Sequence, residues 1–218
     1  MRTPRRGDPA GTDTASAHFG TQRTVPVPLF RSLMDSLTED RRWVILDLGT
    51  ARPQMIDLLS RFRCRLDIAD LAESAVASLD RVEGTVRVPD PVESLRAMPD
   101  TEPVDIVLSW DFLNYMSPEQ ITRLMRSIST RCRPGAFVHA LIAYSDSLMP
   151  QRPGQFAPID EGRLLNLSTA TPDRHAPRYS IDDLDRCSPG FTIERIRLLT
   201  SGMQEYLFRL LYAVDASR

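Results

Sequence analysis

The sequence predicts an α/β domain with a mainly parallel central sheet and helices on both faces. Short apolar runs, typical of strands buried on both faces, alternate with segments whose apolar residues recur at helical spacing. Such alternation indicates right-handed crossover connections, which join parallel strands. The pattern changes near the end of the chain, where two strand-like runs flank the short connection Thr200–Gly202. We therefore expect the sheet to end in an antiparallel hairpin.

The folded domain is expected to span residues 25–218. Residues 1–24 are rich in Arg, Gly, Thr, Ser and Pro and contain almost no large apolar side chain. Such a segment cannot offset the entropy cost of ordering, so we expect a disordered N-terminal tail. A first helix is predicted by five apolar residues at helical spacing between Leu29 and Leu37.

Five strand-like runs follow, with a helical pattern in each interval between them. The predicted strands are 43–48, 64–69, 85–88, 104–110 and 136–144, and the predicted helices are 53–62, 71–79, 92–98 and 117–132. Pro53 suits a first helical turn, and Ser117 is a typical helix N-cap. Pro134-Gly135 ends the last of these helices. A short helix at 181–187 and strands at 191–199 and 203–214 complete the domain.

Residues 145–180 interrupt the alternation. They contain five prolines, and one weak helical pattern is visible at 161–167. A segment this long with so little structure is often a lid or a binding loop. We therefore expect it to cover the substrate side of a site.

Composition excludes several classes of function. Formal net charge is −2 at pH 7, so nucleic acid is unsupported as a partner. All 27 basic residues are Arg, which excludes chemistry that needs a Lys amine. Cys64, Cys132 and Cys187 are widely spaced, so neither disulfides nor a metal site is expected. Without an apolar run of membrane-helix length or a secretory signal, we expect a cytoplasmic protein that does not enter a membrane.

The order of elements resembles the class I methyltransferases that use S-adenosylmethionine, over roughly residues 28–214. The resemblance rests on five landmarks. The first is DLG at Asp47–Gly49, where the family has an acid followed by glycines that pass under the cofactor. The second is the acid after the second strand, Asp70, with Asp67 as its rival, which in the family bonds both ribose hydroxyls. The third is Asp90, in the place of the residue that contacts the adenine amino group.

The last two landmarks surround the fourth helix of the pattern. VDIVLSWDFLNY, beginning at Val104, is similar to the family's fourth strand and the loop after it, and RPG at Arg133–Gly135 is similar to the usual KPGG. The resemblance implies a Rossmann-like, seven-stranded, mostly parallel sheet in the order 3-2-1-4-5-7-6, with the last strand antiparallel. It also implies S-adenosylmethionine as the cofactor, bound at the carboxyl ends of the strands.

The glycine loop departs from the family pattern. The family has D-x-G-x-G-x-G, whereas this chain has D-L-G-T-A-R-P, with Ala51 and Pro53 in place of two glycines. A β-carbon can block close backbone approach, and Pro53 removes an N–H that would face a ligand. Arg52 is placed either to bond the carboxylate of the methionine moiety or to fill the pocket. The predicted cofactor-binding residues are Asp47, Gly49, Ala51, Arg52, Asp70, Asp90, Ser109 and Trp110.

The sequence carries no catalytic signature. SWDF stands after the fourth strand where NPPY would indicate methyl transfer to a nitrogen of bases or glutamine. Many relatives act by proximity and alignment alone. The nearest polar candidates for orienting a substrate are Asp111, Asn114 and Tyr115, unless these residues only pack the helix and loop. His139 lies within an apolar strand, so we interpret it as a hydrogen-bonded core histidine in preference to a general base.

We therefore expect methyl transfer from S-adenosylmethionine to a small-molecule acceptor. The alternative is a catalytically inactive relative that keeps the fold and acts as a binding or regulatory partner of another protein. A nicotinamide-dependent oxidoreductase lacks its GxGxxG turn here, and a phosphate-loop nucleotidase lacks GxxxxGK[ST].

Overall fold

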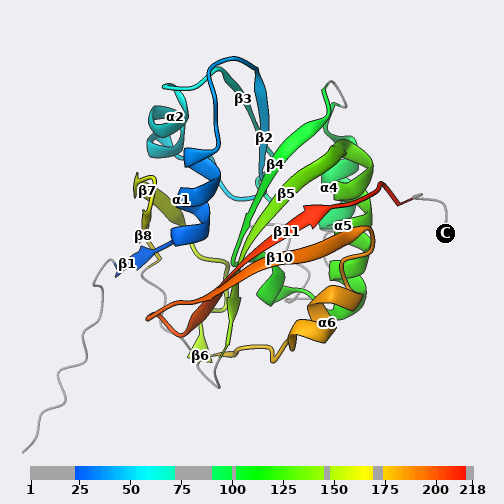
Figure 1. Ribbon diagram of the computed structural model, residues 1–218. Helices are drawn as coiled ribbons and strands as arrows, with labels where there is room; N and C mark the ends of the chain where they lie inside the picture. The colour runs from blue at the N-terminus through cyan, green and yellow to red at the C-terminus, as the bar shows by residue number, and fades with distance from the viewer. Residues whose placement is uncertain (1–22, 72–89, 100–101, 145–147, 169–173, 215–218) are drawn as a thin grey trace, which may run out of the picture.

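The computed structural model describes residues 23–71, 90–99, 102–144, 148–168 and 174–214, which are built around a six-stranded sheet (Figure 1). Its strands are β2 (Trp43–Asp47), β3 (Cys64–Ile68), β4 (Val104–Trp110), β5 (Cys132–Ala143), β10 (Phe191–Leu198) and β11 (Met203–Leu210). They lie in the order β3-β2-β4-β5-β11-β10. The first four are parallel, whereas β11 is antiparallel to both β5 and β10.

This mixed α/β sheet fits the Rossmann-like methyltransferase fold that the sequence predicted. Numbered as the predicted strands, the six observed strands follow the order 2-1-4-5-7-6, with the expected closing hairpin between β10 and β11. The strand predicted at 85–88 lies outside the described residues, as does nearly all of the helix predicted at 71–79. The full seven-strand order is therefore not confirmed.

Helices cover both faces of the sheet (Figure 1). One face carries α1 (Pro28–Asp35) and α2 (Pro53–Leu59), and the other carries α4 (Pro91–Ala97), α5 (Pro118–Arg131) and α6 (Ile181–Arg186). Successive residues of β4 alternate between two cores: Ile106 packs among residues of α1 and α2, and Val107 among residues of α4 and α5. The continuous apolar runs of β2 and β4 are thus explained by burial on both faces.

Helix starts follow from residues that are recognisable in the sequence. Pro28, Pro53 and Pro118 each lie in the first turn of a helix, where a missing N–H costs little. Ser117 caps α5, and its capping box with Gln120 satisfies two N–H groups reciprocally. The predicted helix starts at Pro53 and Ser117 are confirmed.

Strand β5 begins earlier than expected. We predicted a strand from residue 136 after a stop at Pro134-Gly135, whereas β5 starts at Cys132, directly after α5. The pairing with β4 shifts within the next five residues, so the start of the strand bulges. Gly135 has a φ of 84°, which glycine adopts without strain. Pro134-Gly135 therefore lies inside the irregular start of the strand.

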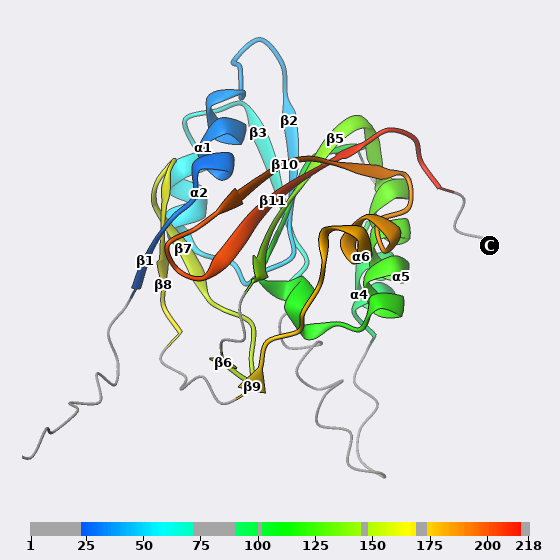
Figure 2. The ribbon, with the colours of Figure 1, turned by 60° about the horizontal axis from the view of Figure 1, so that its bottom comes forward.

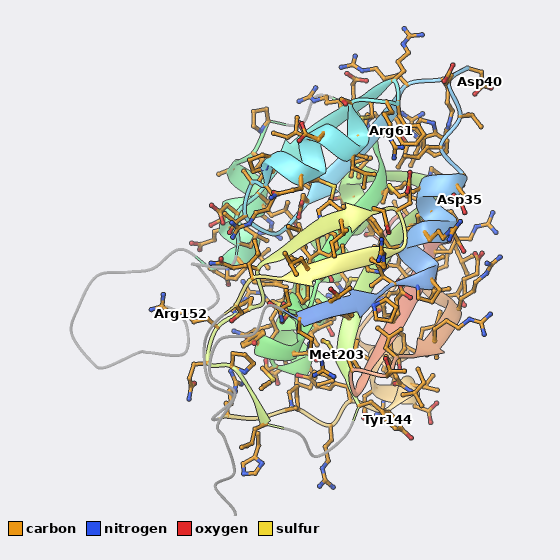
Figure 3. All side chains as sticks on the ribbon, turned by 90° about the vertical axis from the view of Figure 1, so that its left-hand side faces the viewer. Asp35, Asp40, Arg61, Tyr144, Arg152 and Met203 are labelled. Carbon is orange, nitrogen blue, oxygen red and sulfur yellow. The ribbon has the colours of Figure 1, made fainter. Side chains whose placement is uncertain are left out.

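The helix predicted at 161–167 is wrong. Strands β7 (Phe156–Asp160) and β8 (Arg163–Asn166) form a hairpin, and β1 (Arg23–Pro26) pairs with β8 to complete a three-stranded antiparallel sheet. The Gly162 N–H donates to Asp160 Oδ1 at 2.9 Å, which fixes the turn. Helical spacing was misleading because β8 pairs on both sides, with the adjacent β7 and with β1 from a distant part of the chain. Figure 3 shows this small sheet beside α1 and α2.

The structure also differs from the expected domain organisation in two segments. β1 includes Arg23 and Thr24, which we had assigned to the tail, and residues 1–22 lie outside the described residues. The segment 145–180 holds more structure than expected, since β6 (Leu148–Met149) and β9 (Arg174–His175) also pair. Both lie beyond the carboxyl end of β4, near the short helix η1 (Phe112–Tyr115) that follows it (Figure 2).

Candidate functional site

Two acids lie at the carboxyl ends of neighbouring strands. Asp47 is the last residue of β2, and Asp70 follows the end of β3 by two residues. Trp110 ends β4 on the other side of β2. Ligands of open α/β sheets bind in this position, at the carboxyl ends of the parallel strands. The structure thus brings three of the predicted cofactor-binding residues together.

Backbone strain is concentrated at the same place. Among the described residues, the non-glycine residues with positive φ are Asp70, at 45°, and Trp110, at 50°. Such conformations are uncommon for residues that carry a β-carbon, and they gather at binding and catalytic sites. The two strained residues flank Asp47 from either side, which marks this end of the sheet independently of any family resemblance.

Asp47 is a buried acid with an altered pKa. Its Oδ1 accepts hydrogen bonds from the Gly49 N–H at 2.8 Å and from the Trp110 Nε1–H at 2.7 Å. Burial raises the pKa of the Asp47 carboxyl to about 6, against the lowering effect of these two bonds, and the charge of Asp70 raises it further. The carboxyl group is therefore protonated more readily than that of an ordinary aspartate, and a nearby cation would stabilise its ionised form.

Asp70, and not its rival Asp67, lies beyond the end of its strand with an exposed side chain. Asp70 is exposed, and its Oδ1 accepts a hydrogen bond from Thr50 Oγ1–H at 2.9 Å. Asp67 lies within β3, where its Oδ1 accepts from Arg65 Nε–H at 2.9 Å. Between the two acids, Asp70 has the position and the freedom to bind hydroxyl groups of a ligand.

The side chain of Trp110 lies directly against the glycine of the DLG loop. A β-carbon placed on Gly49 would be 2.9 Å from Trp110 Cδ1 and 3.1 Å from Nε1. Glycine at this position therefore makes room for the indole ring. The following residues, Ala51 and Arg52, lead into α2, and Arg52 is its N-cap with extended backbone.

The remaining predicted cofactor residues are less open to a ligand. Asp90 caps α4 by accepting from the Val92 N–H at 3.0 Å, and it forms an ion pair with Arg123 at 2.6 Å. Ser109 is buried, and its Oγ has no hydrogen-bond partner in the described structure. A buried hydroxyl without a partner is unusual and is available to a polar group that reaches it.

The three candidate substrate-orienting residues have structural partners. Asn114 uses its amide group to bond the β5 backbone, with Nδ2 donating to Leu141 O at 2.8 Å and Oδ1 accepting from Ala143 N–H at 2.9 Å. The Tyr115 hydroxyl lies 2.8 Å from Arg152 O and 3.1 Å from Pro150 O. Asn114 therefore joins η1 to β5, whereas Tyr115 holds the segment that leads towards β7.

Asp111 anchors the same segment. Both of its carboxyl oxygens accept from the Gly154 N–H, at 2.9 and 3.0 Å. Burial raises the pKa of Asp111 to about 7 in spite of this bond. The Tyr115 pKa is also raised, by burial first and then by the charge of Asp111. These polar residues after β4 hold residues 150–154 against the carboxyl end of the sheet.

Sequence reasoning expected Asp47 and Asp70 at the carboxyl ends of strands, where the structure has them, but it missed their neighbours. Gly154 and Phe156 reach this region from a segment that carried no recognisable motif, and the Phe156 ring stacks with Trp110 at 6.0 Å between centroids. His139 is confirmed as a hydrogen-bonded core histidine, with Nε2 2.8 Å from Glu205 Oε1. Sequence reasoning also gave no sign that Glu205, on β11, points into the core.

The described residues give no indication of a metal site or of a membrane span. No group of three His, Cys, Asp or Glu side chains within them is arranged to hold a metal ion. No helix in this part of the chain is both long and apolar enough to cross a membrane. Cys64, Cys132 and Cys187 are free thiols.

Comparison with known proteins gives similarities to solved structures, while no protein-family model and no curated protein matches the chain. LaPhzM shares 14% identity with a TM-score of 0.45, over 84% of this chain and 54% of that chain. The mitomycin 7-O-methyltransferase MmcR shares 16% identity with a TM-score of 0.47, over 83% of this chain and 52% of that chain. The chain thus spans about half the length of these two proteins.

A third structure is closer in length. It is the 1,6-didemethyltoxoflavin-N1-methyltransferase of Burkholderia thailandensis, with bound 1,6-didemethyltoxoflavin and S-adenosylhomocysteine. It shares 16% identity with a TM-score of 0.47, over 84% of this chain and 76% of that chain.

Proposed function

We propose that the carboxyl end of β2, β3 and β4 binds S-adenosylmethionine and that the protein transfers its methyl group to a small-molecule acceptor. The observation that carries this proposal is the pair Asp47 and Asp70, which lie at the carboxyl ends of the neighbouring parallel strands β2 and β3. In the described part of the chain, no ion pair joins either acid to a basic side chain. A ligand that carries a sulfonium and an ammonium cation supplies the missing positive charge.

The residues present fit such a ligand in two respects. Asp70 offers an exposed carboxyl group, of which one oxygen is bonded to Thr50, and this suits the two hydroxyls of a ribose. Asp47 is buried and accepts hydrogen bonds, which suits the ammonium group of the methionine moiety. The DLG backbone between them is the loop on which the family resemblance places the cofactor.

The acceptor side is proposed to lie under residues 148–168. When bound, S-adenosylmethionine supplies an electrophilic methyl group. The protein has to align the acceptor with this group and keep water away, which needs no acid–base residue. Asp111 and Tyr115 act here as positioning residues, since they hold residues 150–154 in place and do not present free polar atoms to a substrate.

Neither the comparisons nor the described structure supports the alternative of an inactive relative that serves as a protein partner. Isolated protein that turns over a small-molecule acceptor would exclude this alternative. Nucleic acid stays unsupported as an acceptor, because the net charge is −2.

Replacing Asp70 with alanine is expected to weaken binding of S-adenosylmethionine and S-adenosylhomocysteine by about 10- to 100-fold. The variant loses charge-assisted hydrogen bonds to the ribose, which contribute roughly 1.5–3 kcal/mol. Titration calorimetry of the purified protein measures the change. Asp67→Ala is the matched control, because Asp67 is a nearby acid within β3 whose carboxyl group bonds Arg65. Equal losses in the two variants would contradict the assigned site.

Binding of S-adenosylmethionine is expected to strengthen from about pH 5 to about pH 7. The pKa of Asp47 is about 6, so at lower pH the folded protein must release a proton from this carboxyl before a cation can pair with it. The affinity should therefore fall by up to about tenfold per pH unit below the pKa. Calorimetry across this range checks the slope. Asp47→Asn should bind more weakly at neutral pH and lose the slope, and an unchanged slope in this variant would assign it to another group.

A further inference from the structure

The indole ring of Trp110 fills the space above the DLG loop. It lies against Gly49 and donates to Asp47, and only 5% of the residue is exposed. Aromatic rings surround it: Phe30 at 5.7 Å, His139 at 5.9 Å and Phe156 at 6.0 Å between centroids. The ring is therefore enclosed at the point where the proposed ligand would contact the backbone of the DLG loop.

The conformation of Trp110 is unusual for a bulky residue. Its φ of 50° lies in the left-handed region, which residues with a β-carbon rarely adopt. The pairing of β4 with β5 shifts between Leu108 and Trp110, so the backbone leaves the regular strand at this position. A strained residue persists where its surroundings hold it, and here the Asp47 hydrogen bond and the surrounding rings do so.

The contacts of Trp110 resemble those that the ligand needs. The Nε1–H gives a buried acid the donor that an ammonium group would otherwise provide. The ring covers Gly49, whose backbone the resemblance places under the cofactor. The indole and the ligand therefore compete for the same acceptor and for the same surface of the loop.

We propose that Trp110 is a removable plug, whose indole ring keeps the cofactor site closed and must leave Gly49 and Asp47 before the ligand binds. This inference rests on the function proposed above and adds to it a residue that controls access. Asp47 exchanges the indole N–H for the ligand's ammonium group, so the buried acid keeps a donor in both states. Phe156 stacks on the ring, so opening of the plug also displaces the start of β7, on the acceptor side of the site.

The fluorescence of Trp110 reports its movement directly. The chain has two tryptophans, and Trp43 lies at the opposite end of β2 from Asp47, so Trp43→Phe leaves Trp110 as the only tryptophan. S-adenosylhomocysteine is the probe, because it carries the same ammonium and ribose without being consumed. We expect emission at longer wavelength and greater quenching by acrylamide on binding, with a midpoint equal to the calorimetric dissociation constant.

A second variant tests the energetic side of the inference. Trp110→Phe keeps an aromatic ring in the enclosed position but removes the indole N–H and part of the side-chain volume. Since a closed state lowers the apparent affinity by the fraction of open molecules, the variant should bind S-adenosylhomocysteine at least about threefold more tightly. Trp43→Phe alone is the control for the loss of a tryptophan, and its affinity should equal that of the unmodified chain.

The outcomes separate this inference from the proposed function. Binding with unchanged Trp110 emission, and with equal affinity in Trp110→Phe, would leave the function standing and overturn the plug. Binding by Trp110→Phe but not by the unmodified chain would support the plug and contradict cofactor use by the isolated protein. If neither protein binds up to millimolar concentrations, both proposals fail.

Discussion

Replacing Glu205 with alanine is expected to lower the free energy of unfolding by about 3–5 kcal/mol, because it removes the acceptor from a buried polar cluster. Glu205 lies on β11 with no exposed surface. Its Oε2 accepts from the Leu29 N–H at 2.9 Å, and its Oε1 accepts from the Phe30 N–H at 2.8 Å. Oε1 also lies 2.8 Å from His139 Nε2. The substitution leaves all three polar groups buried without this partner.

Glu205 replaces the local cap that α1 lacks. The N-cap residue of this helix is Val27, which has no side-chain hydrogen bond to offer. The N–H groups of Leu29 and Phe30 lie in the first turn and have no intrahelical acceptor. A carboxyl group at this end of a helix is also favoured by the helix dipole. The contact therefore attaches α1 to the central sheet and fixes it beside Trp110, which Phe30 touches.

Urea unfolding followed by circular dichroism measures the loss of unfolding free energy in Glu205→Ala. Glu205→Gln keeps the side-chain volume and one good acceptor oxygen, so we expect a smaller loss of unfolding free energy than in the alanine variant. Glu194→Ala is the matched control on the neighbouring strand β10, where the residue is exposed, and its change should stay within about 0.5 kcal/mol. A loss below about 1 kcal/mol in Glu205→Ala would mean that water satisfies the cluster as well as the carboxyl does.

Most elements of the fold could be predicted because their signals are local. The apolar run of β4 is long enough to indicate burial on both faces, and Ser117 with Gln120 marks the start of α5 within four residues. The acids of the site were predictable for a related reason. Parallel strands present their carboxyl ends at one edge, so acids that follow such strands, here Asp47 and Asp70, must lie close together.

The misjudged elements depend on contacts between distant residues. The apolar residues of 161–167 allow either a helix or a strand, and the choice is made by pairing with β7 and with the distant β1, whose Val25 lies opposite Leu164. The bond from Trp110 to Asp47 spans 63 residues, and the bonds from Leu29 and Phe30 to Glu205 span about 175. No spacing in the sequence encodes such pairs, so the closed state of the site was visible only in the folded chain.

The stability of the protein is expected to fall as pH rises from about 5 to about 7, and Asp111→Asn should remove a large part of this dependence. Burial raises the pKa of Asp111 from 3.8 to about 7. Between these two values the folded state binds a proton that the unfolded state has released. Stability therefore decreases with pH, by about 1 kcal/mol per pH unit for one such group. Asparagine cannot ionise and still offers an oxygen to the Gly154 N–H, so the variant should be relatively most stabilised above neutral pH.

Chemical unfolding at several pH values checks this slope, and two comparisons assign it. Asp183→Asn is the control, because the pKa of Asp183 is lowered by its bonds to Ser180 and Arg186, so its contribution is lost only in acid. Saturating S-adenosylmethionine distinguishes the two acids with raised pKa. A bound cation stabilises the ionised form of Asp47 and should reduce the contribution of Asp47 to the pH dependence of stability. The contribution of Asp111 should persist, because the partner of its carboxyl group is a backbone N–H. A slope that vanishes entirely with ligand would place Asp111 in contact with the cation and make it a binding residue instead of an anchor for residues 150–154.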